Sequence, residues 1–450
     1  AAVLQQAGDW QDDTGGDHSG DYGSRSVGII ASTHDDFYFG TYDDAGNMLT
    51  NPAAFMETDG AKKFLNFNED GFAGIAEGGK YYTRDFDGKT AYRVIYRPNM
   101  IHPLVAFSTT CVGYAVDFFD TTLGAPKPLP ASDQIWPIKA VFNSLGVIGL
   151  LIFMVSFTLV LLDTPVFSAL RSGEIVQPAP VQDSGAKAWY WVLLMIGAVF
   201  SGASFLFCMN TVYSKTTNFF VQTGPLTIGT WAALCGVFAI FCSAVFYGAY
   251  GKKHGWSARR AGLYLNLEQL WKTIALAVIV IVVSFGLVFA AHYFFQVDYR
   301  MYVVAFKTFG ADKVLIALRY LPFFLLFYVV NSISANCFNY NTIGGKNGNI
   351  LIFAFFNALG AIFVVASQYI CFYATGYQLY GLTEGQRIGP IWLFPCMVLL
   401  FVTPIMSRII YKRTRNPYIA GLINAMFIVM ISCSNTTTIL GGGELIATTF

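Results

Sequence analysis

The 450 residues are 55% apolar and 16% aromatic but only 12% charged, which is about half the charged fraction of an ordinary soluble globular protein. This composition excludes a wholly soluble chain, because lipid must solvate much of the surface. The net charge of +1 hides an asymmetry: residues 1–135 contain 19 acidic and 9 basic residues, and the remainder contains 8 acidic and 19 basic residues. Neither part has the basic stripe with interleaved aromatics that binds nucleic acid, so we exclude nucleic acid as a partner.

The N-terminal part begins with polar residues and then shows a strand followed by two acidic residues. Residues 1–25 are rich in Gly and Asp and predict a loop. Residues 26–33, SVGIIAST, form a short apolar run bounded by turn formers, which is typical of a buried parallel strand. Asp35 and Asp36 follow directly, and the aromatics of 37–42, FYFGTY, are expected to pack in a core or to form a sugar-binding platform.

A second strand leads to a histidine. Residues 90–98, TAYRVIYRP, alternate between apolar and polar side chains as a strand does, and the chain then reaches His102. Pro103 suits the first turn of a helix, and the apolar spacing of residues 104–119 predicts that helix. His102 is therefore expected between a strand and a helix.

The order strand, acid, strand, histidine, helix suggests catalysis. In an α/β-hydrolase sheet the acid follows a late strand, and the histidine follows the last strand, before the C-terminal helix. The histidine accepts the proton of a nucleophile, and the acid fixes the tautomer of the imidazole. We therefore predict His102 as the base and either Asp35 or Asp36 as the acid. Alternatively, the two aspartates cap a strand end or lie in a solvated loop, and His102 bonds to the backbone at a helix start.

Three segments carry a resemblance to a known family. The sequences ASTHDDF, YRPNMIHPLVAFSTT and DQIWPIKAVFN resemble the terminal part of α/β-hydrolase-fold domains in multi-pass membrane proteins of bacteria, over about residues 30–450. The resemblance implies a serine hydrolase. However, the chain contains no GxSxG, and GDHSG at 16–20 has its serine one place too late. The nucleophile is therefore expected on an upstream segment or a second chain, and the interval between Asp36 and His102 implies an insertion around residues 42–88.

The sequence predicts no metal and no cofactor. His18 and His34 are expected to be solvated, although a metal site formed by them and nearby aspartates is an alternative. Only Cys111 lies in the polar region, so no internal disulfide is expected there. The other seven cysteines lie in or beside apolar runs and are interpreted as small packing residues.

Eight apolar stretches are long enough to cross a membrane, for which about 20 residues are needed. They are approximately residues 137–162, 188–213, 226–250, 272–297, 314–335, 349–374, 388–411 and 418–434. If residues 1–135 lie outside the cytoplasm, the inner loops contain ten basic residues and the outer loops five. Because basic residues accumulate on the cytoplasmic side, we predict that residues 1–135 and the C-terminus lie outside, with the bundle in the plasma membrane.

Several features qualify this topology. The first 30 residues lack the basic start and apolar core of a signal peptide, so an exported domain requires an upstream segment that was removed or is not included here. Arg319, His292 and Lys139 lie near span ends, where their charged groups can reach the interface. Because no carboxylate occurs in the middle of a predicted span, a proton-coupled or cation-coupled transporter is disfavoured.

Two connecting segments have unusual sequences. Residues 331–349 contain six Asn and three Gly, and they predict either a polar cytoplasmic loop or a re-entrant segment that lines a cavity. Residues 298–313 combine apolar and basic residues at mixed helical spacing, which suggests a segment along the outer interface.

The predicted fold is a polytopic α-helical membrane protein with about eight transmembrane helices and an N-terminal extracytoplasmic α/β region that resembles the end of an α/β-hydrolase sheet. Its parts are a polar loop at 1–25, a partial α/β domain at 26–135, the bundle at 136–434 and a short extracytoplasmic tail at 435–450. The predicted function is a membrane-anchored hydrolase of esters or amides. A transport or channel component with an acidic ligand-binding outer domain, or a non-catalytic assembly subunit, is the alternative. The expected partners are the lipid bilayer and the polypeptide that completes the domain.

Overall fold

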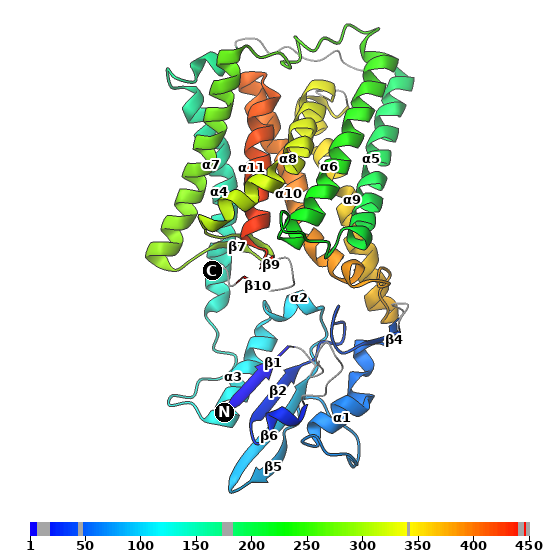
Figure 1. The fold of residues 1–450 in the computed structure, drawn as a ribbon, viewed down its shortest axis with the longest axis vertical. Coiled ribbons are helices and arrows are strands. Elements are labelled where there is room, and N and C mark those ends of the chain that lie inside the picture. The colour runs from blue at the N-terminus through cyan, green and yellow to red at the C-terminus, as the bar shows by residue number, and fades with distance from the viewer. Residues whose placement is uncertain (7–18, 44–47, 173–182, 340–342, 440–444, 447–450) are drawn as a thin grey trace. The chain divides into compact units, whose positions relative to one another are not determined.

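The computed structural model describes all of the chain except residues 7–18, 44–47, 173–182, 340–342, 440–444 and 447–450 (Figure 1). The chain divides into two compact units. The first, the sheet unit, comprises Ala1–Lys139 together with Ala366–Ile391. The second, the helical unit, comprises Ala140–Val365 and Trp392–Phe450. The sheet unit thus combines the N-terminal part with a short segment from much later in the sequence.

A four-stranded sheet forms the centre of the sheet unit in the part of the chain that the structure describes. Its strand order is β1-β2-β6-β5, with β1 parallel to β2, β2 parallel to β6, and β5 antiparallel to β6. The strands are β1 (Ala2–Gln5), β2 (Ser26–Ile30), β5 (Tyr82–Phe86) and β6 (Lys89–Tyr96). The strands predicted at 26–33 and 90–98 correspond to β2 and β6. The loop expected over residues 1–25 instead contains β1 and the 3-10 helix η1 (Ser19–Tyr22), because β1 gains backbone hydrogen bonds from the edge of β2.

Helices cover both faces of this sheet. One face packs against η2 (Pro52–Glu57) and α1 (Asp59–Leu65) and includes Val27 and Ile29 in its core. The opposite face packs against α3 (Thr109–Leu123) and includes Ile30 and Val94. Successive residues of β2 therefore enter different cores, as the two-residue period of a strand requires, and the strand is completely buried.

The helix predicted over residues 104–119 is interrupted. It forms as a short helix α2 (His102–Val105), which ends at Ala106, and the longer α3. Ser108 has an extended backbone conformation and caps α3 through a hydrogen bond from the amide of Cys111 to its hydroxyl (3.3 Å). Pro103 lies in the first turn of α2, as predicted. A small hairpin of β3 (Thr41–Tyr42) and β4 (Met48–Thr50) lies within the predicted insertion.

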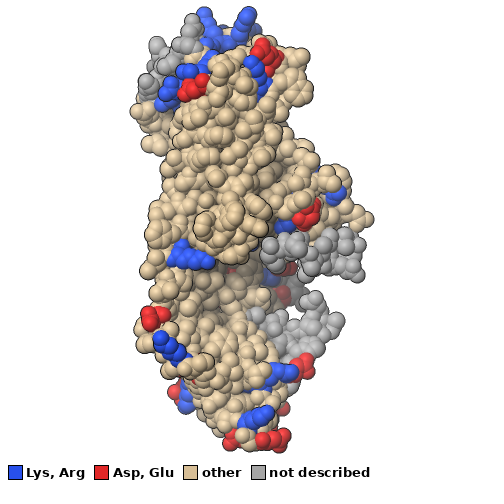
Figure 2. Space-filling model, turned by 90° about the vertical axis from the view of Figure 1, so that its left-hand side faces the viewer, with Lys and Arg blue, Asp and Glu red and all other residues tan. Residues whose placement is uncertain are grey.

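Eight helices in the described residues are long and apolar enough to cross a membrane. They are α4 (Trp136–Leu162), α5 (Ser184–Thr211), α6 (Thr223–Phe246) with the π-helical turn η4 (Tyr247–Gly251), α7 (Leu267–Phe295), α8 (Asp312–Ile333) with the π-helical turn η5 (Ser334–Phe338), α9 (Gly345–Thr375), α10 (Glu384–Thr414) and α11 (Pro417–Ser434). The prediction of an eight-span polytopic helical protein is confirmed in its number of spans. On the face in Figure 2, charged side chains gather at the end of the helical unit where α4 and α6 end. The adjoining part of this face is a broad band with no charged side chains.

Close packing within the helical unit depends on glycines. A Cβ on Gly360 of α9 would lie 2.4 Å from the carbonyl oxygen of Ala198 in α5, and one on Gly236 of α6 would lie 2.6 Å from the carbonyl oxygen of Leu326 in α8. Small residues allow helix backbones to approach in this way, which is the usual basis of helix association in lipid. The helix α11 packs against α8 and α7 and is the most buried of the eight.

The two unusual connecting segments take different forms. Residues 298–313 contain the antiparallel hairpin of β7 (Tyr299–Met301) and β8 (Val304–Phe306), and their position along the outer interface stays a prediction. Residues 331–338 continue α8 through η5, so this half of the Asn/Gly-rich stretch is helical and not a loop. Short strands β9 (Thr438–Ile439) and β10 (Leu445–Ile446) lie in the C-terminal segment.

Candidate active site

The parallel pairing of β2 and β6 continues beyond both strands and brings the predicted acid and base together. The amide of Ala31 donates to the carbonyl of Tyr96 (2.8 Å), and the amide of Thr33 donates to the carbonyl of Pro98 (3.0 Å). An isolated parallel bridge then joins His34 to Ile101. Since each segment advances one residue beyond this bridge, Asp35 and His102 become neighbours at the carboxyl ends of the strands.

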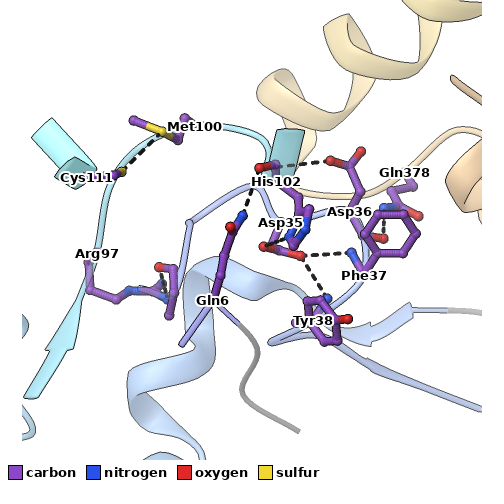
Figure 3. A network of polar contacts seen from close by, with 11 residues as sticks. Gln6, Asp35, Asp36, Phe37, Tyr38, Arg97, Met100, His102, Cys111 and Gln378 are labelled. Atoms are coloured by element: carbon purple, nitrogen blue, oxygen red, sulfur yellow. Dashed lines mark hydrogen bonds and ion pairs between the residues drawn. The ribbon is translucent and has the colours of Figure 1, made fainter. Parts of the chain in front are cut away.

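Asp35 contacts the imidazole of His102. Its Oδ2 lies 2.9 Å from Nδ1 of His102, and its Oδ1 accepts hydrogen bonds from the backbone amides of Phe37 (3.0 Å) and Tyr38 (2.8 Å) (Figure 3). The carboxylate is completely buried, whereas the His102 side chain is 25% exposed. Both oxygens of Asp35 are therefore held in place, and one of them fixes the orientation of the histidine ring.

Asp36 is equally buried but contacts the main chain instead. Its Oδ2 accepts from the backbone amide of His102 (3.3 Å), and its own carbonyl accepts from Nε2 of Gln378 (2.9 Å). Burial and the nearby charge of Asp35 raise the pKa of Asp36 to about 7, against weaker opposing effects of the Tyr369 hydroxyl and of His102. Of the two candidate acids, Asp35 is thus the one that orients the imidazole.

Further side chains complete the surroundings of His102. Nε2 of Gln6 donates to the carbonyl of His102 (2.9 Å). The rings of Phe37 and Tyr38 lie with their centroids 5.3 and 5.4 Å from that of His102. The aromatic residues predicted as packing groups therefore form part of the wall around the base, and Figure 3 shows them beside it.

Arg97 ties the end of β2 to the helix that follows the acids. Its guanidinium donates to the carbonyls of Ala31 (3.0 Å), Pro52 (2.8 Å) and Ala53 (2.8 Å). Burial lowers the pKa of Arg97 to about 10, so the side chain stays charged at neutral pH. The arginine fixes the strand end from which Asp35 and Asp36 project.

The connection between α9 and α10 contributes to the same unit. His34 stacks on Tyr373 with centroids 4.3 Å apart and meets Phe372 edge-on at 5.4 Å. Burial lowers the pKa of His34, so the ring is predominantly neutral at pH 7. The side chain predicted as solvated is therefore part of an aromatic cluster. The described residues contain no group of three or more potential metal-binding side chains. His18, the other histidine of that alternative, lies outside the described residues.

The geometry defines what His102 can do chemically. If Nδ1 carries a hydrogen and donates it to the buried carboxylate, Nε2 keeps the lone pair and can accept a proton from a nucleophile. Among the described residues, the polar partners of His102 are Asp35, Asp36 and Gln6. None of these three is a serine, threonine or cysteine that could act as the nucleophile. The described part of the site therefore holds an oriented imidazole with no nucleophile among its polar partners.

Polar contacts of three residues were not predicted from the sequence, namely those of Gln6, Gln378 and Arg408. Gln6 and Gln378 contact the site through backbone carbonyls from distant positions in the sequence, and no local pattern marks them. Arg408 lies inside the predicted span 388–411 and is almost completely buried, yet it was not among the intramembrane ionisable groups singled out from the sequence. Its position just before the basic cluster YKRTRN concealed it, although an arginine within a span is itself a signal.

Comparisons with known proteins identify no relative: no family model, no curated protein and no solved structure matches the chain. The interpretation of the site therefore depends on its geometry.

Proposed function

We propose that this chain supplies the base and the acid of a Ser-His-Asp hydrolase that acts on an ester or amide and is anchored in the membrane. His102 is the general base, and Asp35 holds its imidazole in the productive tautomer. The observation that carries the proposal is the 2.9 Å contact between Nδ1 of His102 and Oδ2 of Asp35, a completely buried carboxylate whose other oxygen is fixed by two backbone amides.

The arrangement of the sheet supports this function. β1, β2 and β6 are consecutive parallel neighbours, with the acid after β2 and the histidine after β6. The helix between β2 and β6 packs on one face of the sheet, and α3, which follows the histidine, packs on the other. This is the order expected for the end of an α/β-hydrolase sheet, in which the histidine precedes the final helix.

The proposed nucleophile is a serine on polypeptide outside this sequence, either upstream or on a second chain. In the described part of the sheet, β1 is an edge strand that pairs with β2 on one side. In that fold the nucleophile follows an earlier strand of the same sheet. Further parallel strands beside β1 would extend the sheet on the side where that earlier strand is expected. We also propose that residues 1–135 lie outside the cytoplasm, on the basis of the ten basic residues in the opposite loops against five.

The test uses the native full-length gene product in its own membrane. A fluorophosphonate probe reacts with a serine only when a base activates it, so we expect labelling of this protein or of a chain that purifies with it, and a loss of about 10³-fold or more in the labelling rate with His102→Ala. His292→Ala, in the last turn of α7, is the matched control and should label at the normal rate. Absence of labelling in the native protein and every associated chain would refute the proposal.

A further inference from the structure

A long cavity lies in the helical unit, between α5, α6, α8, α9 and α10, and α11 contributes Ile428 to its lining. Its volume is about 210 Å³. Its lining on α6 extends from Ile228 to Phe246, which corresponds to roughly 27 Å along the helix axis at the usual rise per residue. The cavity is therefore elongated, a shape that suits an extended chain better than a compact ligand.

Aromatic and aliphatic side chains form most of its wall. Phe200 stacks on Phe238 with centroids 4.1 Å apart, and Trp231 packs edge-on against Phe205 at 5.1 Å. None of the described residues that line the cavity carries a charge. Walls of this kind solvate hydrocarbon and give a polar ligand no partners along most of their length.

One end of the cavity, where α6 and α8 end and α5 begins, is lined by the polar side chains of Tyr190, Ser243, Ser334 and Asn339. Other polar side chains of the lining include Ser201, Asn331 and Asn357, and the amide of Asn331 donates to Oδ1 of Asn357 (2.7 Å). Asn339 is only 6% exposed, and neither polar atom of its amide makes a well-formed hydrogen bond to another described residue, although it lies beside the Tyr190 hydroxyl. Because a buried amide without good partners is costly, this end of the cavity is suited to a ligand that hydrogen-bonds to it.

A buried arginine lies behind the polar end. Arg408 is 1% exposed, and its guanidinium donates to Oδ1 of Asn336 (2.8 Å), to Oδ1 of Asn349 (3.1 Å) and to the carbonyl of Ala335. Nδ2 of Asn349 in turn donates to the hydroxyl oxygen of Tyr190 (3.4 Å). Since that oxygen accepts a hydrogen bond, the hydroxyl hydrogen of Tyr190 can be donated to another group. The positive charge therefore polarises a chain of amides that ends in a donor on the cavity wall.

We propose that the cavity binds a lipid with one long apolar chain and an anionic oxygen headgroup. The chain lies along α6, and the headgroup accepts hydrogen bonds from the Tyr190 hydroxyl and the Asn339 amide nitrogen. The charge of Arg408 attracts an anion to this position and repels a cation. Carboxylates and phosphates share the required chemistry, so a fatty acid and a monoalkyl phosphate are the two sources to distinguish. This site contains no residue of the proposed hydrolase site, so the two proposals are tested independently.

A glycine in the cavity lining offers a position from which a larger side chain can block the cavity. Gly197 lines it, and a Cβ at this position would meet no atom within 4 Å. In the purified full-length chain, a long-chain fatty acid with a diazirine and an alkyne should crosslink to peptides of the lining helices α5, α6, α8, α9, α10 and α11, and Gly197→Leu should reduce the yield about tenfold. Gly286→Leu in α7 is the matched control, because it has the same free space but is not part of the cavity lining, and it should crosslink normally. Equal yields in the two variants, or crosslinks confined to other helices, would overturn the proposal.

Headgroup recognition is tested by competition and by conservative variants. A fatty acid or an alkyl phosphate of the same chain length should displace the probe, and the stronger of the two identifies the headgroup class. An alkylamine should compete at least about tenfold less well. Tyr190→Phe and Asn339→Leu should each weaken probe binding by roughly tenfold, the value of a hydrogen bond to a charged group, with thermal unfolding as a check that the variants are folded. Competition by the alkylamine as strong as that by the acids would refute an anionic headgroup.

Discussion

Asp35 and Asp36 are adjacent in the sequence and equally buried, but their carboxylates have different partners. Asp35 contacts the imidazole of His102, whereas Asp36 contacts the backbone amide of the same residue. The sequence HDDF marks both as candidates and offers no basis for choosing between them. The choice depends on which of the two side chains projects toward the His102 ring after β2 ends. The turn in which Asp35 accepts hydrogen bonds from the backbone amides of Phe37 and Tyr38 sets this direction.

This difference predicts unequal effects of the two amide substitutions. Asp35→Asn should lower the rate of fluorophosphonate labelling of the native protein by about 10³–10⁴-fold, because the amide favours the wrong tautomer of the imidazole. Asp36→Asn keeps an oxygen acceptor for the His102 amide and should lower the rate by less than about tenfold. Equal losses in both variants would show that Asp35 has no special role in orienting the base.

The raised pKa of Asp36 predicts a pH-dependent stability. The pKa is about 7 in the folded protein and about 3.9 in an unfolded chain, so between these values the unfolded chain releases a proton that the folded protein retains. The free energy of unfolding should therefore fall as pH rises from about 4 to 7, by at most about 4 kcal/mol, and Asp36 should cause no further change above that range.

Thermal unfolding of the full chain in detergent at a series of pH values measures this effect. Asp36→Asn should match the unchanged protein near pH 4 and have a higher Tm at pH 8, because it removes the ionisation that destabilises the folded state. Asp70→Asn replaces an exposed aspartate and should leave the pH dependence as it is. A Tm difference for Asp36→Asn that is the same at every pH would rule out ionisation of Asp36 as the cause.

At the scale of elements, the periodicity of apolar residues predicts the strands and helices that depend on local sequence alone. β2, β6 and the eight spans follow from apolar patterns, and the span boundaries differ from the prediction by a few residues. β1 was not predicted, because a four-residue strand in a polar segment forms only through pairing with β2. The break between α2 and α3 was also missed, since Ser108 continues the helical spacing but acts as an N-cap.

Helix packing gives a prediction at this scale. In Gly360→Ala the added Cβ would collide with the backbone of α5, so the free energy of unfolding should fall by about 1–3 kcal/mol. Gly286→Ala is the matched control in α7, where no atom lies within 4 Å, and alanine should stabilise the helix by up to ~1 kcal/mol. Thermal unfolding in one lipid or detergent compares the two. If Gly360→Ala is as stable as its control, α5 and α9 do not approach as closely as described.

At the scale of the whole chain, the orientation in the membrane is open to a direct test. Lys80 in the sheet unit and Lys253 in the loop after α6 are both exposed, and the proposed topology places them on opposite sides. In intact cells, a membrane-impermeant maleimide should label Lys80→Cys above the background of the unchanged protein. Lys253→Cys should be labelled only after permeabilisation. The reverse pattern would show that the sheet unit is cytoplasmic.

The sheet unit is built from two segments that lie far apart in the sequence, and this determines when its site can be completed during synthesis. Residues up to Lys139 leave the ribosome first, but Ala366–Ile391, which include Gln378 and the aromatic partners of His34, come only after residues 140–365. At about 5–20 residues per second, translation of that interval takes roughly 10–50 s. For this time the newly made sheet has an uncovered aromatic surface and incomplete support around Asp36. The sheet unit can therefore reach its final structure only after Ala366–Ile391 have been synthesised.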